Sequence, residues 1–369
     1  MKIIVLRNNL KNALDAASRT VEENLNLPIL KNILIKADQS KIIVSSTNLE
    51  AAITKVVPGK ITEPGEATIP FGLLNSLINN LQSERIDLEE KKYNLLLKTD
   101  NYEAIIQGMS PSEFPIIPKI APEAGYFEIS RSVLKEAINK IINACQISDL
   151  RPEISGILFN FESNVFKLVA TDSFRLAEKS IPETQFKNNL SKSGKTIIPL
   201  KTIQEIVRIL NDEESVKVFI DDSQALFKTE TLEVITRLID GQFPDYGPII
   251  PKALETEIVV EKQELVNAMK LAGSFTARSG EVVIKVGDDK KIVEVYSADS
   301  GLGENKYLIS AKISGDPVKA SFNWKYLLDG LKNIYTDTVL FGLQGDSRPA
   351  IMKAPNDTSY FYILMPIKN

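Results

Sequence analysis

The chain has 369 residues, of which 43% are hydrophobic and 25% are charged, and its formal net charge is −4. This length exceeds what one hydrophobic core usually organises, and the composition is that of a folded globular protein, which excludes a disordered chain. Histidine is absent, which excludes Ser-His and Cys-His nucleophile pairs and histidine-ligated metal sites. The apolar run at 3–6 is too short for a signal peptide, and no run of about 18 apolar residues predicts a membrane span, so we expect a cytoplasmic protein.

The first third of the chain predicts two helices and a set of short strands. An apolar strand at 3–6 leads directly into an amphipathic helix at 7–21, and a second strand and helix follow at 68–70 and 71–82. Segments rich in β-branched residues and bounded by turn residues predict an antiparallel meander. Its strands are expected at 33–37, 41–45 and 51–57.

The same arrangement returns twice along the chain. The second copy has predicted helices at 130–145 and 200–210 and strands at 126–129, 157–161, 165–169, 177–181 and 197–199. The third has helices at 261–275 and 323–333 and strands at 257–260, 282–286, 292–296, 304–309 and 320–322. The starts recur about every 125–130 residues, a period typical of whole domains. We therefore predict an α+β fold of three repeated domains, each with two helices packed on antiparallel sheet, at 1–122, 123–252 and 253–369.

Proline-rich segments close the first two repeats. One reads Phe114-Pro115-Ile116-Ile117-Pro118-Lys119, and the other runs from Phe243-Pro244 to Pro248-Ile249-Ile250-Pro251-Lys252. The linkers therefore repeat together with the domains. Three copies of one domain favour a symmetric assembly over a single catalytic cleft.

The residues that could support catalysis have simpler interpretations. Cys145 is the one cysteine and lies on the apolar face of a predicted helix, so we expect a buried thiol and no disulfide. Ser193-Gly194-Lys195-Thr196 resembles the end of a phosphate-binding loop, but the first glycine of that motif is missing and a strand follows. Gly301-Leu302-Gly303 lacks the third glycine of a dinucleotide-binding motif. The acidic runs are interpreted as solvated turns, not magnesium ligands, at Asp221-Asp222, Asp288-Asp289 and Asp212-Glu213-Glu214.

The positive charge is concentrated in the predicted helices. Counted over 7–21, 71–82, 131–145, 200–210, 262–278 and 323–333, they carry 13 basic and 5 acidic residues, a net charge of +8 in an acidic protein. If symmetry brings these helices to one surface, they form a basic lining that contacts the phosphates of duplex DNA without reading its sequence. The cations expected to face DNA are Arg7, Lys11, Arg19, Lys135, Lys140, Lys201, Arg208, Lys270, Lys325 and Lys332.

Four phrases strongly resemble the bacterial DNA polymerase III beta subunit, the sliding clamp. They run in family order along the whole chain: Leu27-Pro28-Ile29-Leu30-Lys31-Asn32-Ile33-Leu34, Ala170-Thr171-Asp172-Ser173-Phe174-Arg175-Leu176-Ala177, Ile239-Asp240-Gly241-Gln242-Phe243-Pro244-Asp245-Tyr246 and Leu364-Met365-Pro366-Ile367. The resemblance implies three clamp domains per subunit and a homodimeric ring of six domains around duplex DNA. It also implies a processivity factor in DNA replication that has no catalytic activity and needs no cofactor.

The resemblance further implies a pocket that takes short linear motifs from the replicative polymerase, the clamp loader and repair polymerases. By matching phrases it lies at Ile154, Thr171, Ser173, Phe174, Arg175, Leu176, Pro244, Pro248, Ile249, Pro349, Ile363, Leu364, Met365, Pro366 and Ile367. An apolar motif is expected to contact Leu176, Ile249, Ile363 and Met365.

The chain departs from the family at several positions. Ser173-Phe174 stands where the family often has Gly-His, which bears on the preferred motif. Asn24 and Leu200 stand where basic residues are frequent, which puts DNA contact there in doubt. The ending Lys368-Asn369 replaces a frequent Arg-Leu, which leaves the last pocket contact open.

A ring requires the first and third repeats to meet across a dimer. The late strand at 102–106 is the expected edge of the first repeat, opposed by residues 271–275, with Ile106 and Phe275 in the seam. Two alternatives from other classes remain: a phosphate-dependent enzyme that uses Lys195 and an acidic doublet, and a protein scaffold that never binds DNA.

Overall fold

The computed structural model describes the whole chain apart from residues 121–124, 163, 190–193, 211–214, 277 and 369. It forms two compact units. Unit 1 contains Met1–Ser132, Phe186–Ser191 and Gln204–Leu238, and unit 2 contains Val133–Gln185, Lys192–Ile203 and Ile239–Asn369. The middle third of the chain therefore contributes to both units.

All six predicted helices are present in the described part of the chain. They are α1 (Arg7–Ala17), α2 (Phe71–Asn80), α3 (Arg131–Ile141), α4 (Leu200–Ile209), α5 (Lys262–Gly273) and α6 (Trp324–Lys332). Short 3-10 segments lie at Pro28–Lys31, Pro111–Glu113, Ile142–Ala144, Pro152–Ile154, Glu183–Gln185 and Gly247–Ile249. All six helices end earlier than predicted, and α1 stops at Ala17, four residues short, so Arg19 lies beyond its end. None of the described helices is long and apolar enough to cross a membrane.

Unit 1 contains two antiparallel sheets. The first has the order β5-β1-β7-β8-β9 and the second the order β14-β10-β16-β17-β18-β4-β3-β2-β6. The strands of the first sheet are β1 (Lys2–Leu6), β5 (Gly59–Glu63), β7 (Arg85–Lys91), β8 (Asn94–Lys98) and β9 (Glu103–Ile106). Those of the second are β2 (Asn32–Ala37), β3 (Ile42–Thr47), β4 (Ala51–Val57), β6 (Gly65–Pro70), β10 (Tyr126–Ser130), β14 (Phe186–Asn188), β16 (Ser215–Ile220), β17 (Gln224–Lys228) and β18 (Leu232–Arg237).

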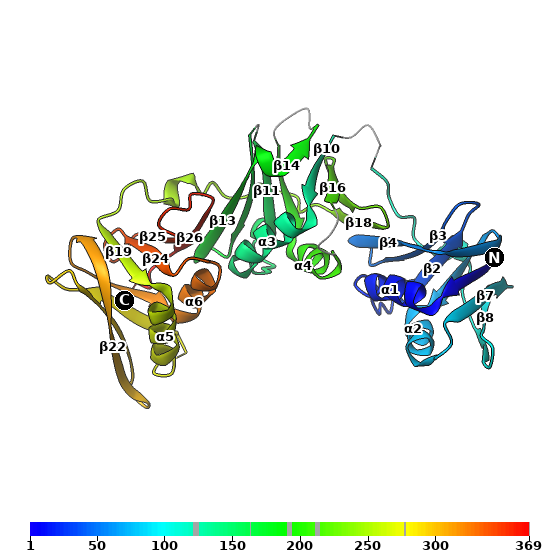
Figure 1. Ribbon diagram of the computed structural model, residues 1–369, viewed down its shortest axis with the longest axis horizontal. Coiled ribbons are helices and arrows are strands. Elements are labelled where there is room, and N and C mark those ends of the chain that lie inside the picture. The colour runs from blue at the N-terminus through cyan, green and yellow to red at the C-terminus, as the bar shows by residue number, and fades with distance from the viewer. Residues whose placement is uncertain (121–124, 163, 190–193, 211–214, 277, 369) are drawn as a thin grey trace. The chain divides into compact units, whose positions relative to one another are not determined.

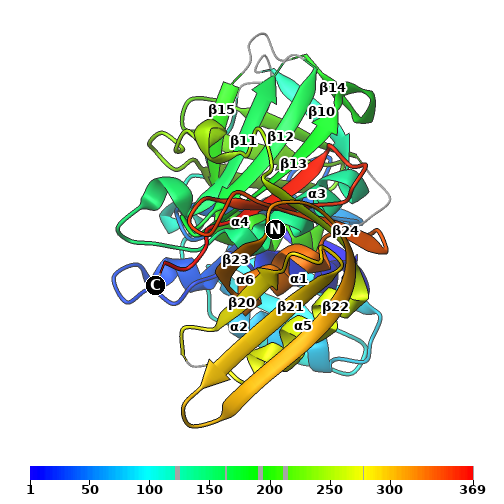
Figure 2. The ribbon, with the colours of Figure 1, turned by 90° about the vertical axis from the view of Figure 1, so that its left-hand side faces the viewer.

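Unit 2 contains one continuous sheet in the order β15-β11-β12-β13-β26-β25-β24-β19-β22-β21-β20-β23. In Figure 2 the β11, β12 and β13 meander and the long β21–β22 hairpin are both visible. The strands are β11 (Gly156–Glu162), β12 (Val165–Thr171), β13 (Arg175–Pro182), β15 (Gly194–Pro199), β19 (Thr256–Glu261), β20 (Glu281–Val286), β21 (Ile292–Asp299), β22 (Gly303–Gly315), β23 (Val318–Asn323), β24 (Thr338–Leu343), β25 (Ala350–Lys353) and β26 (Tyr360–Leu364).

The three predicted meanders are confirmed as β2-β3-β4, β11-β12-β13 and β20-β21-β22. The sequence pattern did not show that the last strand of one repeat pairs with the third meander strand of the repeat before it. β18 pairs antiparallel with β4, and β26 pairs antiparallel with β13. These two strand junctions carry the sheets from one repeat into the next, and they position the sites described below.

The core of unit 1 forms where the amphipathic helices meet the sheets (Figure 1). Leu10 and Leu14 of α1 and Leu74 and Ile78 of α2 lie four residues apart on one helix face, and all four are buried in one cluster. The single cysteine lies in unit 2 and is buried as predicted, and burial raises the pKa of the Cys145 thiol to about 12. A thiol in that state is protonated at neutral pH and is a poor nucleophile.

Candidate functional site

The turn between β12 and β13 organises the predicted pocket residues of unit 2. The Thr171 hydroxyl donates to the Arg175 carbonyl at 2.7 Å, and Asp172 Oδ1 accepts from the backbone N–H groups of Phe174 and Arg175, both at 3.0 Å. Ser173 has φ of 78°, a left-handed conformation that short polar side chains tolerate. The turn leaves Phe174 62% exposed at its tip.

Arg175 anchors this turn to α6. Its Nε lies 2.9 Å from Asp172 Oδ2, and its NH1 group lies 2.7 Å from Asp329 Oδ2. The guanidinium also stacks 4.1 Å from the centroid of the Tyr326 ring. Two carboxylates and an aromatic ring already contact the guanidinium of Arg175. This side chain therefore positions the turn, and few of its N–H groups are left to bind a ligand.

Of the four residues predicted to contact an apolar motif, Leu176 and Ile363 form a closed floor that belongs to the core. Leu176 and Ile363 face each other across the β13–β26 pair, and each is 1% exposed. Ile154, Thr171, Leu364 and Pro366 are also buried. A ligand can therefore touch these side chains only at their edges, and binding must depend more on the groups around them.

The partly exposed groups come from three segments. The Met365 N–H donates to the Phe174 carbonyl at 2.8 Å, which holds the chain after β26 against the turn. In the linker, Pro248 is exposed and Ile249 is 36% exposed, while Phe243, Tyr246 and Ile250 pack against the cluster that contains Leu176 and Ile363. Pro349 and Ile367 are partly exposed.

A hydroxyl-carboxylate pair fixes the linker to β13. The Tyr246 hydroxyl donates to Glu178 Oε2 at 2.7 Å. Burial, followed by this hydrogen bond, raises the pKa of Tyr246 above its ordinary value. The phenol therefore remains a hydrogen-bond donor, and the linker stays attached, throughout the neutral pH range.

The structure adds residues that the sequence pattern missed. Arg151 donates to the Ser173 hydroxyl at 2.8 Å and pairs with Glu153 at 3.1 Å, so it supports the turn from a separate segment. Asp329 and Tyr326 complete the Arg175 network from α6. Of these contacts, only the ion pair between Asp172 and Arg175 could have been predicted from sequence spacing, because the other partners of Arg175 are far away in the chain.

The predicted DNA-facing cations differ in exposure. Arg19, Lys201, Arg208, Lys270, Lys325 and Lys332 are exposed, whereas Arg7, Lys11 and Lys135 are partly buried. Part of this charge is neutralised locally. Glu205 pairs with Arg19 at 3.5 Å and Arg208 at 2.6 Å, and Asp329 pairs with Lys332 at 3.1 Å.

Lys140 is a correction to the predicted set. Its side chain is 7% exposed, pairs with Glu136 at 3.0 Å and lies 4.7 Å from the centroid of the Tyr335 ring. The Tyr335 ring and the Glu136 carboxylate therefore leave little of the ammonium group accessible to a phosphate. Two family departures also have structural explanations: Leu200 is 6% exposed, and Asn24 Oδ1 accepts the backbone N–H groups of Asn26 and Leu27 in a turn.

Ile106 is a second correction. β9 is an edge strand, as predicted, but Ile106 is 1% exposed and belongs to the core of unit 1. Its neighbour Ile105 is 68% exposed, because successive side chains of a strand point to opposite faces. Phe275 follows α5 and is partly buried, whereas Leu271 on that helix is 49% exposed.

The residues considered for an enzyme site occupy ordinary structural positions. Lys195 lies within β15 opposite Asn160, and four more strand residues separate it from the start of α4 at Leu200, so Lys195 is not at a helix N-terminus as a phosphate-binding loop would require. Asp221 and Asp299 each accept two backbone N–H groups in turns, the second beside Gly301-Leu302-Gly303. Ser193 and the Asp212-Glu213-Glu214 run lie outside the described residues.

The chain matches the DNA polymerase III beta subunit in three consecutive stretches: the N-terminal domain over residues 1–118, the central domain over 128–245 and the C-terminal domain over 248–368. Beta sliding clamps of Staphylococcus epidermidis and Staphylococcus aureus are each 28% identical over 379 residues, which cover 100% of this chain and 99% of theirs. The DNA polymerase sliding clamp of Bacillus subtilis is 26% identical with a TM-score of 0.94, and the alignment covers 100% of this chain and 99% of that one. The beta subunit of Thermotoga maritima is 24% identical with a TM-score of 0.90 over 100% and 99% of the two chains, a likeness of fold.

The consecutive domains and the sheet topology define a DNA clamp, a class of protein that carries no catalytic site. The chain belongs to the DNA polymerase III beta subunit family. Its function is that of a DNA sliding clamp, a non-catalytic processivity subunit of the polymerase.

Proposed function

We propose that two copies of this chain close into a ring around duplex DNA and tether the replicative polymerase in the cytoplasm. Each copy contributes clamp domains at 1–122, 123–252 and 253–369. The observation that carries the ring is a pair of unpaired strand edges, one in each unit. β9 ends the first sheet of unit 1, and residues 303–310 of β22 pair on one side alone, with β21, among the described residues. A closed ring cannot leave a long duplex without opening, so tethering needs little direct affinity.

The proposed seam joins β9 of one copy to β22 of the other by strand addition. Exposed apolar residues lie on both edge strands, Ile105 on β9 and Leu308 on β22, and Leu271 on α5, which packs against β22, is also exposed. Exposed apolar groups beside an open strand edge favour burial against a partner, and a second copy offers the complementary edge. Phe275, which follows the C-terminal end of α5, is also proposed to lie in this seam.

Light scattering after size-exclusion chromatography tests the seam. Ile105→Asp combined with Leu271→Asp should give folded monomers, because both carboxylates would have to be buried in an apolar interface. Leu25→Asp, at a fully exposed loop leucine, is the matched control and should remain dimeric. A double variant that stays dimeric would rule out this seam.

The exposed helix cations are proposed to face the phosphates of the encircled DNA. Lys201 on α4 and Lys270 on α5 are exposed, so their charges are accessible to a backbone. Reversing both to Glu should weaken retention on nicked circular duplex at low salt and reduce its salt dependence, while the dimer persists. The control is Lys60→Glu with Lys285→Glu, two exposed lysines on strands. If the two double variants were retained on DNA equally across a salt series, Lys201 and Lys270 would have no specific electrostatic role.

The surface around Phe174, Ile249 and Met365 is proposed to form a groove that binds linear motifs of the polymerase, the clamp loader and repair polymerases. Its support is an exposed aromatic ring, Phe174, on a hydrogen-bonded turn beside Met365, since short motifs gain most of their affinity from one or two apolar anchors. Phe174→Ala and Met365→Ala should each weaken a fluorescent Gln-Leu-Asp-Leu-Phe peptide by about tenfold, from the apolar area lost. Ring retention should be unchanged. Unaltered peptide affinity in both variants would place the motif site elsewhere.

A further inference from the structure

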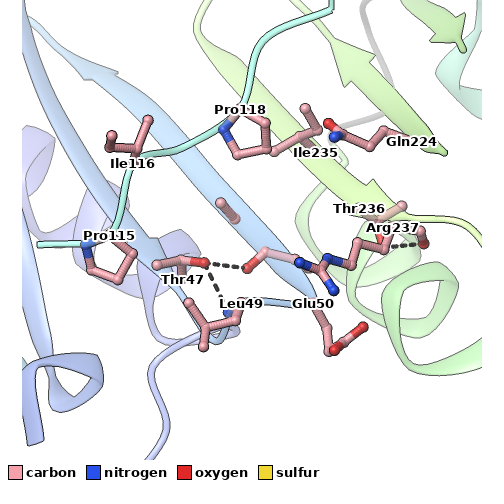
Figure 3. Close-up of a pocket in the computed structure, with 12 residues that line it drawn as sticks. Thr47, Leu49, Glu50, Pro115, Ile116, Pro118, Gln224, Ile235, Thr236 and Arg237 are labelled. Atoms are coloured by element: carbon pink, nitrogen blue, oxygen red, sulfur yellow. Dashed lines mark hydrogen bonds between the residues drawn. The ribbon is translucent and has the colours of Figure 1, made fainter. Parts of the chain in front are cut away.

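A pocket lies entirely within unit 1, at the junction of β4 and β18 (Figure 3). Its volume is about 370 Å³. The walls come from the β3–β4 turn, from the linker at 115–118 and from the ends of β17 and β18. Figure 3 shows Ile116 and Pro118 on one side and the Arg237 side chain extended toward the turn. A concave site of this size accommodates one or two side chains of a peptide.

The β3–β4 turn of this pocket has the same hydrogen bonds as the β12–β13 turn of unit 2. The Thr47 hydroxyl donates to the Ala51 carbonyl at 2.9 Å, as Thr171 does to Arg175. Asn48 Oδ1 accepts the N–H groups of Glu50 and Ala51 at 3.1 and 2.8 Å, in the place of Asp172.

The backbone at the tip also agrees between the turns. Leu49 has φ of 74°, and Ser173, at the same position of the other turn, has φ of 78°. The two turns are thus copies of one local structure.

The strands beside the two turns pair in the same register. Ala52 faces Ile235 across β4 and β18, as Leu176 faces Ile363 across β13 and β26. The Arg237 N–H donates to the Glu50 carbonyl at 2.9 Å, which is the bond that Met365 makes to Phe174. Position by position, the unit 1 pocket is therefore the counterpart of the proposed motif groove.

The linkers complete this correspondence. Residues 115–119 and 248–252 have the same sequence, Pro-Ile-Ile-Pro-Lys. Ile116, which lines the unit 1 pocket, is 95% exposed, and its counterpart Ile249 is 36% exposed. An almost fully exposed isoleucine beside a concave apolar surface favours contact with another chain.

The differences between the two sites indicate what the unit 1 pocket would bind. Ala52 stands where the other site has Leu176, and the shorter Ala52 side chain lines the pocket together with Ile235, although both residues are largely buried at 3% and 5% exposure. Arg237 stands where the other site has Met365, is exposed, and forms no ion pair within the described residues. Gln224 Oε1 is buried in the pocket wall without a hydrogen-bond partner among the described residues, so it is available to a peptide N–H.

We propose that this pocket is a second docking site for a linear segment of a partner protein, one that combines an apolar anchor with an acidic residue. The anchor lies over Ala52 and Ile235 against Ile116, and the carboxylate pairs with Arg237. The ligand class rests on the proposed motif groove in unit 2, from which the correspondence is drawn. Each chain would then hold two partner segments of different chemistry at the same time.

The test uses the full-length protein and the peptide Gln-Leu-Asp-Leu-Phe with its phenylalanine replaced by photoreactive benzoylphenylalanine. Adducts are mapped by mass spectrometry over a titration. We expect adducts in unit 1, within 47–52, 115–119 or 224–237, as well as around Phe174. Arg237→Glu should lower the unit 1 adducts at least tenfold, since it replaces an attraction by a repulsion, and leave the adducts around Phe174 unchanged. Lys60→Glu is the charge-matched control and should change neither set.

Ala52→Leu, which enlarges a side chain in the pocket wall, should also lower the unit 1 adducts. Circular dichroism checks that this variant keeps the wild-type fold. If it does not fold, Arg237→Glu still tests the proposal. Adducts confined to unit 2, or unit 1 adducts that survive Arg237→Glu, would overturn the inference and leave the motif groove standing. Adducts in unit 1 alone would overturn the groove and support the second site. Absence of adducts from both would overturn both.

Discussion

The β12–β13 turn and the β3–β4 turn have one backbone structure but different side-chain support. In unit 2, the carboxylate of Asp172 accepts the turn N–H groups and also binds Arg175, which reaches Asp329 on α6. In unit 1, Asn48 accepts the same N–H groups with a neutral amide, and Ala51 replaces the arginine. The comparison shows that the hydrogen-bonded turn needs one side-chain acceptor, whereas rigid attachment to a helix requires the added charges. The variants below separate these contributions.

Removing the acceptor from each turn should have the largest effect. Asp172→Ala should lower the free energy of unfolding of unit 2 by about 3–5 kcal/mol, because it removes the acceptor of two turn N–H groups and one of the two carboxylates that pair with the largely buried guanidinium of Arg175. Asn48→Ala should cost about 1–2 kcal/mol, the loss of two backbone partners alone. Trp324, the single tryptophan, lies in unit 2 and reports its urea unfolding. Hydrogen exchange over 47–57 follows unit 1. Equal losses in the two turns would contradict the role given to the ion pairs.

Truncating the closed floor should make one junction resemble the other. Leu176→Ala introduces the residue found at Ala52 and should destabilise unit 2 by about 2–5 kcal/mol, because a cavity replaces a well-packed side chain. Denaturant titration followed by Trp324 fluorescence measures this loss. A cost below about 1 kcal/mol would mean that the junction closes around the smaller residue. The size of residue 52 would then not explain why unit 1 has a pocket where unit 2 has a closed floor.

Alkaline pH should affect the two linkers differently. Burial and the hydrogen bond to Glu178 raise the pKa of Tyr246 above that of an ordinary phenol, about 10, so this group contributes its full stability below about pH 10 and loses it as the pH rises further. The slope should be about 1.4 kcal/mol per pH unit for this tyrosine. The linker at 114–119 has no tyrosine, so its packing should show no such slope. Tyr246→Phe should reduce the slope of unit 2 in urea titrations between pH 9.5 and 11, and an unchanged slope would assign it to other groups.

Glycine at the turn tips should have the smallest effect. Leu49 and Ser173 both adopt positive φ, where a side chain is strained and glycine is not. Leu49→Gly should stabilise its turn by about 0.5–1 kcal/mol, and Ser173→Gly by less, because a short polar side chain tolerates this conformation better. Thermal unfolding and hydrogen exchange over each turn measure the changes. Destabilisation by Leu49→Gly would show that its side chain has a packing role at the pocket.

The phrase that contains Asp172 and Arg175 drew attention to a segment that the structure shows as the β12–β13 turn, next to Met365. That this segment binds partner motifs stays a prediction. The phrase did not show that Arg175 is held by Asp329 and Tyr326, which are about 150 residues away in the chain. The unit 1 pocket was missed because its parts, spread over more than 190 residues, carry no motif of their own.

By itself, the sequence determined the repeat of three α+β domains, the six helices and the membership in the clamp family, because helix periodicity, turn residues and matching phrases are local signals. Tertiary structure alone decided which of Ile105 and Ile106 faces the core, since two adjacent isoleucines in a strand point to opposite faces and only the packed sheet selects one. It also decided that Lys140 is covered by Tyr335 and that β4 and β13 continue into the next repeat. Each of these outcomes depends on a partner distant in the chain, and no local pattern of residue types encodes the identity of that partner.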